Sequence, residues 1–516
     1  MKNIIKFGLL ICAALLVLAS CDDFLDTTQK GVSSQEDFYQ TDTQVEQALY
    51  AIYDKVQSDA LTTFEFKNIL SDDAQAGGGS RSDNSSGNEL NEFTFGANNT
   101  QITSMYTKYY EIIYLANILL QKSSDDTDTK VLARAEAKFF RAFAYFDLVT
   151  LWGTPPLVTE PLEAGNYNQP NSTTAELWAQ IETDLTEAIP ELPVKSASSD
   201  AARVSKGAAQ SLLGKAYLYQ EDYSSAASML QNVIDSGEYA LIDDYSQLTL
   251  EASEFGDESI FEISYVADVT QDSESTMIHA YCGPRSGYFT AGTSGLSESG
   301  WGFVNPLPGL REAYLSEGDT VRQLANVIDE DDLANYYGGS FRASDGSQPY
   351  GCDGLIRTKY GAYLSEIAEQ NESYHCVGGT NYRYIRYADV LLMAAEAYNR
   401  SGNDSKAQTY LNQVRSRVGL ADKTSTGDDL FEDIKLERRL ELAFEWVRYQ
   451  DLIRWGDAAS VLADQGKTTC LGTLDSDGNL QYMTTSDAGF KSYNVLLPFP
   501  ETEITVNPYI TQNTGY

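Results

Sequence analysis

The sequence lacks the motifs on which most enzyme families depend. Histidine is nearly absent: His279 and His375 are the only two in 516 residues, and they do not form the HExxH spacing of a zinc protease. No G-x-S-x-G nucleophile elbow, phosphate-binding loop or dinucleotide fingerprint occurs. The run DSDGN at residues 475–479 has its glycine in the wrong place for a calcium loop, so we interpret it as a turn. We therefore expect no catalytic residues, no metal and no cofactor.

Positive charge is also scarce. The chain has 36 lysine and arginine residues against 75 aspartate and glutamate residues, which gives a net charge of −39 at pH 7. Such a surface repels phosphate backbones and anionic lipid headgroups, so we expect no nucleic-acid partner. The excess of negative charge is interpreted as a contribution to solubility.

Long apolar runs are missing except at the N-terminus. Residues 1–20 have the form of a bacterial signal peptide, with Lys2 and Lys6 before an apolar run that is too short for a membrane-spanning helix. The segment ends in Leu18-Ala19-Ser20-Cys21, a lipobox, which predicts lipidation of Cys21 and stable membrane anchoring through several acyl chains. The alternative is an ordinary signal peptide followed by a chance cysteine.

Few cysteines remain once Cys12 is removed with the signal and Cys21 is assigned to lipid. The four others are Cys282, Cys352, Cys376 and Cys470. In an exported protein they allow three pairings, of which Cys352 with Cys376 closes the shortest loop, and buried free thiols are the alternative. None has the spacing of a zinc site.

Two helical hairpins are the clearest structural signal. Residues 384–420 and residues 204–241 each carry two apolar stripes at helical spacing, separated by a polar turn. The spacing between the two helices agrees, because ten residues separate Ala216 from Ala226 and ten separate Ala397 from Ala407. Matching offsets indicate a repeat of the tetratricopeptide kind. The sequence therefore predicts a mainly α scaffold of helical hairpins with a long insertion between the two copies.

Further helices and loops complete the predicted organisation. Apolar periodicity predicts helices over residues 43–57, 104–122, 129–150, 173–189 and 430–454, and alternation predicts a strand over residues 258–265. Residues 68–91 form a loop rich in Gly, Ser, Asn and Asp. Residues 269–379 are irregular but rich in aromatic side chains, which is typical of a functional segment rather than of disorder.

The last predicted helix carries a dense set of charges. Its members are Glu437, Arg438, Arg439, Glu441, Glu445, Arg448, Asp451 and Arg454. They fit either a partner interface or pairing at i, i+4 on a solvated helix face. We favour the solvated face.

Five motifs in order resemble the SusD-like (RagB/SusD) outer-membrane lipoproteins of Bacteroidota. They are the lipobox with DDFLDTT after it, AKFFRAFAYFDLVTLWGTPP at 137–156, the stretch at 386–420, ERRLELAFEWVRYQDLIRWG at 437–456, and LPFP at 497–500 with the closing residues 507–516. The resemblance covers nearly the whole mature chain. It implies a signal peptide over 1–20, an N-terminal helical region over 21–235, and a RagB/SusD domain over 236–516 that includes the insertion 269–379 and the C-terminal hairpin.

The resemblance also implies a function. Such a protein is lipid-anchored on the extracellular side of the outer membrane, covers a SusC-like TonB-dependent transporter, and captures glycans for uptake without catalysis. Capture of peptides or other non-sugar nutrients by the same architecture is the alternative. A surface glycosidase that uses two carboxylates is a third possibility, but 75 acidic residues leave no identifiable pair.

Ligand-binding positions are implied by the same resemblance. In relatives the site is built from the loop after the early helices and from the irregular insertion, here residues 68–91 and 281–303. The implied ligand-binding residues are Asp72, Asp73, Cys282, Arg285, Trp301, Arg357 and Tyr384. The alternatives are that Asp72 and Asp73 cap turns, Trp301 lies in the core, and Cys282 forms a disulfide. The lack of a second obvious tryptophan favours a compact pocket over a broad platform.

Overall fold

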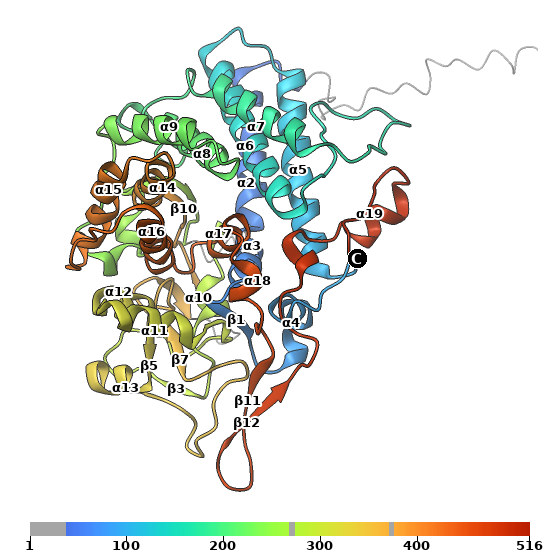
Figure 1. Ribbon diagram of the computed structural model, residues 1–516. Coiled ribbons are helices and arrows are strands. Elements are labelled where there is room, and N and C mark those ends of the chain that lie inside the picture. Colours follow the sequence, from blue (N-terminus) through green and yellow to red (C-terminus); the bar gives the residue numbers. More distant parts are fainter. Residues whose placement is uncertain (1–37, 268–273, 371–375) are drawn as a thin grey trace, which may run out of the picture.

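The computed structural model describes residues 38–267, 274–370 and 376–516. The predicted signal peptide, the lipobox with Cys21 and the DDFLDTT run after it lie outside the described residues, as does His375. Within the described ranges no helix is both long and apolar enough to cross a membrane. Figure 1 shows the long helices in the upper part of the molecule and the irregular insertion, with its short helices and strands, below them.

Four long helices form the N-terminal part of the scaffold. They are α2 (Asp42–Ser58), α5 (Thr100–Lys122), α6 (Asp128–Trp152) and α7 (Thr174–Ala188), which agree with four predicted helices to within a few residues. Thr41 and Thr173 each cap a helix start with a capping box. α6 packs against α2, α5 and α7 and ends at Gly153, whose φ of 77° few other residues tolerate.

Both predicted hairpins are confirmed. The first consists of α8 (Lys206–Tyr219) and α9 (Tyr223–Asp235), and the second of α14 (Tyr387–Arg400) and α15 (Asp404–Arg417). The turn residues Asp222 and Asn403 accept a backbone hydrogen bond at the start of the second helix of each pair. α14 packs on α9, so the two copies are neighbours although about 150 residues separate them.

The predicted helix over residues 430–454 is wrong as a single element. The structure has two helices, α16 (Gly427–Glu441) and α17 (Arg448–Trp455), with turns between them. In these turns Phe444 and Trp446 adopt left-handed backbone conformations, with φ of 61° and 71°. The Trp446 ring contacts Phe64, Tyr382 and Tyr384, so tertiary packing overrides the local helical pattern.

The charges of this segment do not form the solvated face that we favoured. Glu437, Arg438, Glu441, Glu445 and Asp451 are all buried. Most of their partners come from other elements: Glu441 alone accepts hydrogen bonds from Arg322, Arg386 and Arg417. Buried charges persist only when they are paired, and here the pairs join α16 to the insertion and to the second hairpin.

The remaining elements are short. The helices are α3 (Ala60–Ile69), α4 (Ser85–Glu92), α10 (Ile278–Cys282), α11 (Pro308–Glu317), α12 (Thr320–Asn326), α13 (Glu330–Asp332), α18 (Ala458–Val461) and α19 (Glu501–Val506). The strands pair only in twos within the described residues: β1 (Ala74–Gly77) with β4 (Phe303–Pro306), β2 (Ser259–Ile263) with β10 (Tyr382–Arg386), β3 (Phe289–Thr290) with β6 (Ser340–Phe341), β5 (Val327–Asp329) with β7 (Leu355–Arg357), β8 (Ile367–Gln370) with β9 (Cys376–Gly378), and β11 (Thr468–Leu474) with β12 (Leu480–Thr484).

Two predictions on loops have clear outcomes. The turn predicted at 475–479 is the tip of the β11–β12 hairpin, which projects at the bottom of Figure 1. The loop predicted over 68–91 instead holds β1, a 3-10 turn over Arg81–Asn84 and α4. One large apolar core runs through both halves, and a smaller cluster that includes Phe289 and Phe341 fills the insertion.

Candidate ligand-binding surface

The two segments expected to form the site lie side by side. β1 and β4 are antiparallel, with Gly77 opposite Phe303, and the Gly78 amide donates to the Gly302 carbonyl oxygen at 2.7 Å. Glycine is required here, since a Cβ on Gly77 would lie 2.3 Å from the Gly302 oxygen. The close approach brings the loop after β1 next to the loop before β4.

Arg285 and Asp83 meet where these loops join. The Arg285 guanidinium donates to the Trp301 carbonyl oxygen at 3.0 Å and lies 3.8 Å from the Asp83 carboxylate. Asp83 in turn accepts a hydrogen bond from the Gly79 amide at 2.8 Å. The Arg285 and Asp83 side chains are 32% and 39% exposed, so both can still exchange hydrogen bonds with a ligand.

Trp301, whose carbonyl oxygen accepts the hydrogen bond from Arg285, belongs to an aromatic group with Tyr281 and Phe303. It is only partly buried, and it packs edge-on against Tyr281 at 6.1 Å. Tyr281 stacks on the buried Phe303 at 4.4 Å, which holds the group against the core. An aromatic face next to a guanidinium and a carboxylate can hold a ring with an apolar face and hydroxyl groups at its edge. We call Asp83, Arg285 and Trp301 the Trp301 surface.

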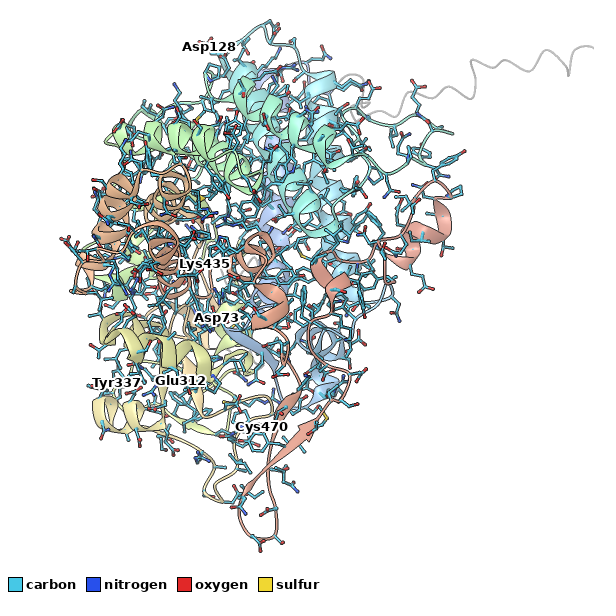
Figure 2. The ribbon with its side chains drawn as sticks, in the orientation of Figure 1. Asp73, Asp128, Glu312, Tyr337, Lys435 and Cys470 are labelled. Atoms are coloured by element: carbon cyan, nitrogen blue, oxygen red, sulfur yellow. The ribbon has the colours of Figure 1, made fainter. Side chains whose placement is uncertain are left out.

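Asp72 and Asp73 form ion pairs with two arginines, Arg439 and Arg448. Asp72 accepts hydrogen bonds from Arg448 at 2.8 and 3.0 Å, and Asp73 accepts one from Arg439 at 2.8 Å. Although burial opposes ionisation, the two arginines hold the pKa of Asp72 below its usual value. Asp73, which Figure 2 labels beside β1, is 2% exposed, so its side chain does not form part of an open surface.

Cys282 and Arg357 are neighbours in the interior. Cys282 is 5% exposed, and burial raises the pKa of its thiol to about 11. Arg357 is 3% exposed and lies between the rings of Phe64 and Phe444, at 5.0 and 5.6 Å from their centres. Both side chains are closed to solvent and cannot contact a ligand at the surface.

Tyr384 belongs to the aromatic core of the scaffold. Its ring packs against Phe143 at 4.8 Å and Trp446 at 5.5 Å, and the surrounding apolar groups raise the pKa of its hydroxyl well above the usual value. The structure thus brings Arg285 and Trp301 together. Of the other five implied residues, Asp72 is ion-paired, Tyr384 is partly buried in the aromatic core, and three are buried, namely Asp73, Cys282 and Arg357.

Sequence reasoning missed Asp83. Its signal was present, since Asp83 lies in the Gly- and Ser-rich run that we expected to contact ligand, but it was one acidic residue among 75. Only the β1–β4 pairing shows that it meets Arg285, which is about 200 residues away.

The predicted disulfide pairings also have an outcome. Cys282, Cys352 and Cys470 are free and buried. This contradicts a Cys352–Cys376 pairing and fits the alternative of buried thiols for these three. The side chain of Cys376 is not among those described. Figure 2 shows Cys470 at the base of the β11–β12 hairpin.

The described part of the chain also contains cavities away from the Trp301 surface. One cavity of about 320 Å³ lies between α2 and β2, and another of about 740 Å³ lies over the loop at residues 240–259. Neither is lined by Arg285 or Trp301. In the described ranges no group of three or more His, Cys, Asp and Glu side chains is placed to hold a metal ion.

The chain matches two family models that together cover most of its length. The model described as the SusD family matches residues 257–516, and one described as starch-binding, associating with the outer membrane, matches residues 23–218. A SusD-like protein of Formosa agariphila is 25% identical over 557 aligned positions, which span 100% of this chain and 99% of that relative. A SusD-like protein of Bacteroides ovatus is 23% identical and spans 99% of this chain and 98% of that relative.

Solved structures agree with these matches. A laminarin-binding SusD-like protein superposes with a TM-score of 0.78 at 32% sequence identity, over 92% of this chain and 99% of that one. Surface glycan-binding protein A from Bacteroides thetaiotaomicron, in complex with laminarihexaose, superposes with a TM-score of 0.74 at 26% identity, over 92% of this chain and 99% of that one.

Proposed function

Because this chain belongs to the SusD family, we propose that it captures glycans at the cell surface and delivers them to a SusC-like TonB-dependent transporter for uptake. Members of this family are carbohydrate-binding proteins and not catalysts, so the chain is a binding protein rather than an enzyme. The ligand stays intact on this surface, and its hydrolysis belongs to other proteins.

The observation that carries the proposal is the Trp301 surface. Trp301 is partly exposed, its carbonyl oxygen accepts a hydrogen bond from Arg285, and the Arg285 and Asp83 side chains both reach solvent. An indole ring covers the apolar face of a pyranose, while charged groups at its edge exchange hydrogen bonds with the hydroxyls. Laminarin is the first glycan to test, because similar proteins of known structure bind laminarin and laminarihexaose.

The proposed location follows from the N-terminal residues. Cys21 would carry the lipid, and the acidic residues directly after it resemble the surface-export signal of Bacteroidota. A lipid anchor with several acyl chains holds a protein on a membrane without a spanning helix. The protein would therefore face outward on the outer membrane, where it covers the transporter.

Affinity electrophoresis tests the proposal. The mature chain without lipid, starting after Cys21, is run through native gels that contain laminarin or one of a panel of other polysaccharides. We expect at least one glycan to retard the protein. Trp301→Ala should remove the retardation, since loss of a central aromatic contact weakens binding by roughly thirtyfold or more.

A matched control separates binding from general damage. Tyr509→Ala removes an aromatic side chain that is 63% exposed and lies elsewhere, so it should leave retardation unchanged. Retardation that survives Trp301→Ala would place the site elsewhere on the protein. If no glycan retards the wild type but titration with peptides releases heat, the glycan proposal is wrong and peptide capture takes its place.

A further inference from the structure

A second concave site lies in the helical half of the molecule. This cavity of about 320 Å³ is formed by one face of α2, by the loop before α8 and by β2. Its lining includes Tyr50, Tyr53, Asp54, Gln57, Arg203 and Ser264. We call it the Tyr50 pocket. It shares no residue with the Trp301 surface, and Figure 1 shows α2 above β1 and α10.

The sequence of α2 explains why aromatic side chains line this pocket. Val45, Leu49, Ile52 and Val56 are buried and attach the helix to the core. Tyr50, Tyr53 and Gln57 lie at i, i+3 and i+7, so they form a neighbouring stripe on the same helix. Tyr50 is 49% exposed, so its ring is open to a ligand.

The walls of the pocket are fixed in place. The Tyr53 hydroxyl donates to Glu136 and accepts the Val204 amide at 2.9 Å, while the Arg203 guanidinium also bonds to Glu136. The Gln57 side-chain amide donates to the Ser264 carbonyl oxygen at 2.7 Å. A pocket whose groups are already held loses little conformational entropy when a ligand enters.

Two polar groups in the lining are unused. The Ser264 hydroxyl is shielded from solvent, and among the described residues it has no hydrogen-bond partner. Asp54 is exposed, and no residue in the described ranges forms a hydrogen bond or ion pair with its carboxylate. A shielded hydroxyl without a partner is costly, so its position indicates that a ligand group or water completes it.

The chemistry of these groups indicates a neutral, hydroxyl-bearing ligand. An exposed tyrosine ring offers a flat apolar face, and Asp54 and Ser264 offer hydrogen bonds to hydroxyls. Four carboxylates line the pocket, those of Asp54, Asp200, Glu262 and Glu274, and the charge of Arg203 is already paired with Glu136. The lining therefore opposes an anion, while hydroxyl groups can donate hydrogen bonds to its carboxylates. The volume is at the lower end of the range for small-molecule sites. It therefore suits one or two sugar rings and is too small for a long chain.

We propose that the Tyr50 pocket is a second carbohydrate site, which takes one or two neutral sugar residues independently of the Trp301 surface. This inference rests on the proposed function, since it extends glycan recognition to another part of the same molecule. Two sites on one protein would raise the residence time of a glycan that reaches both.

Saturation-transfer NMR tests the proposal with a panel of neutral mono- and disaccharides and the mature chain. The Trp301→Ala variant is used as the background, because it removes the first site. We expect transfer to at least one sugar in this background. Adding Tyr50→Ala should lower the transfer by about tenfold, and adding Ser264→Ala should lower it by about threefold, since each change removes one contact.

The control is a tyrosine of equal exposure outside the pocket. Tyr114 on α5 is 53% exposed and does not line the cavity, so Tyr114→Ala should leave the transfer unchanged.

Transfer that is lost in Trp301→Ala alone would overturn the Tyr50 pocket and leave the proposed function intact. Absence of transfer in the wild type as well would overturn the Tyr50 pocket, while the proposed function is decided separately by retardation in polysaccharide gels. Transfer to a lysine-containing dipeptide, with none to any sugar, would overturn the sugar assignment. Thermal melting of each variant confirms that its fold is retained.

Discussion

At the scale of residues, the proposed site depends on the absence of a side chain at Gly79. Gly79 lies between Arg285 and Asp83, and a Cβ there would lie 2.4 Å from the Arg285 Nη2 and 2.6 Å from the Asp83 Oδ2. Arg285 and Trp301 could be named from the sequence because the resemblance to SusD-like proteins implies them. Asp83 and Gly79 could not, because their importance arises from a contact between segments about 200 residues apart.

Gly79→Ala should therefore weaken glycan binding. The added methyl group pushes the Arg285 and Asp83 side chains apart, which removes about one hydrogen bond to ligand and lowers affinity by roughly three- to tenfold. Isothermal titration with laminarihexaose measures this. Gly309→Ala is the control, because its Cβ meets Arg439 only at an ordinary 3.6 Å. Equal affinities for wild type and Gly79→Ala would show that this pair does not contact the ligand.

His279 makes a second prediction at this scale. It is fully buried, with its ring nitrogens 3.0 Å from the Gly361 oxygen and 2.9 Å from the Thr380 hydroxyl, and burial lowers its pKa to about 4. The unfolded chain binds this proton near pH 6.5, whereas the folded chain does not until about pH 4. Burial of the neutral ring therefore costs no free energy of unfolding above pH 6.5. As the pH falls from 6.5 towards 4, the free energy of unfolding decreases by about 3 kcal/mol.

Urea unfolding at pH 7.5 and pH 4.5 tests this prediction. Wild type should lose more free energy of unfolding than His279→Gln, which cannot be protonated. Glu254, whose pKa burial raises to about 7, acts in the opposite direction but is present in both proteins. The same loss in both proteins would contradict the assignment of a neutral His279.

At the scale of elements, the hairpins could be predicted and the α16–α17 segment could not. Each hairpin is specified by local information: apolar stripes, small residues and a capped turn. The segment from Leu430 to Arg454 has an equally good helical pattern, yet it breaks at Phe444 and Trp446 because Trp446 packs against aromatic rings from distant segments. The charges of this segment were predicted to lie on a solvated face because the sequence does not show their partners. Those partners lie on α12, α15 and β10, which are distant in the sequence.

The buried network predicts a large effect from a small substitution. Glu441 is 0% exposed and pairs with Arg322, Arg386 and Arg417. Glu441→Gln leaves buried positive charge without compensation and should lower the free energy of unfolding by about 3–5 kcal/mol. Glu432→Gln on the same helix removes only a surface partner of Lys435, so it should cost about 1 kcal/mol or less. Urea denaturation of both variants checks this, and similar effects from the two would contradict the structural role of the network.

At the scale of the whole molecule, the net charge of −39 limits the ligands that can approach. Long-range repulsion disfavours polyanions and does not act on neutral glycans. Laminarin should therefore retard the protein equally in gels of low and moderate salt, while an anionic polysaccharide such as alginate should not retard it at low salt. Strong retardation by alginate would show that a local basic site overrides the overall charge.

The most direct test of the central claim is a crystal structure of the mature chain with laminarihexaose. The account predicts a sugar ring stacked on Trp301, with hydroxyls in hydrogen-bond reach of Arg285 or Asp83. An oligosaccharide bound only at a place that does not include Trp301 would contradict it, as would a protein that binds no laminarihexaose at saturating concentration and is retarded by no other glycan.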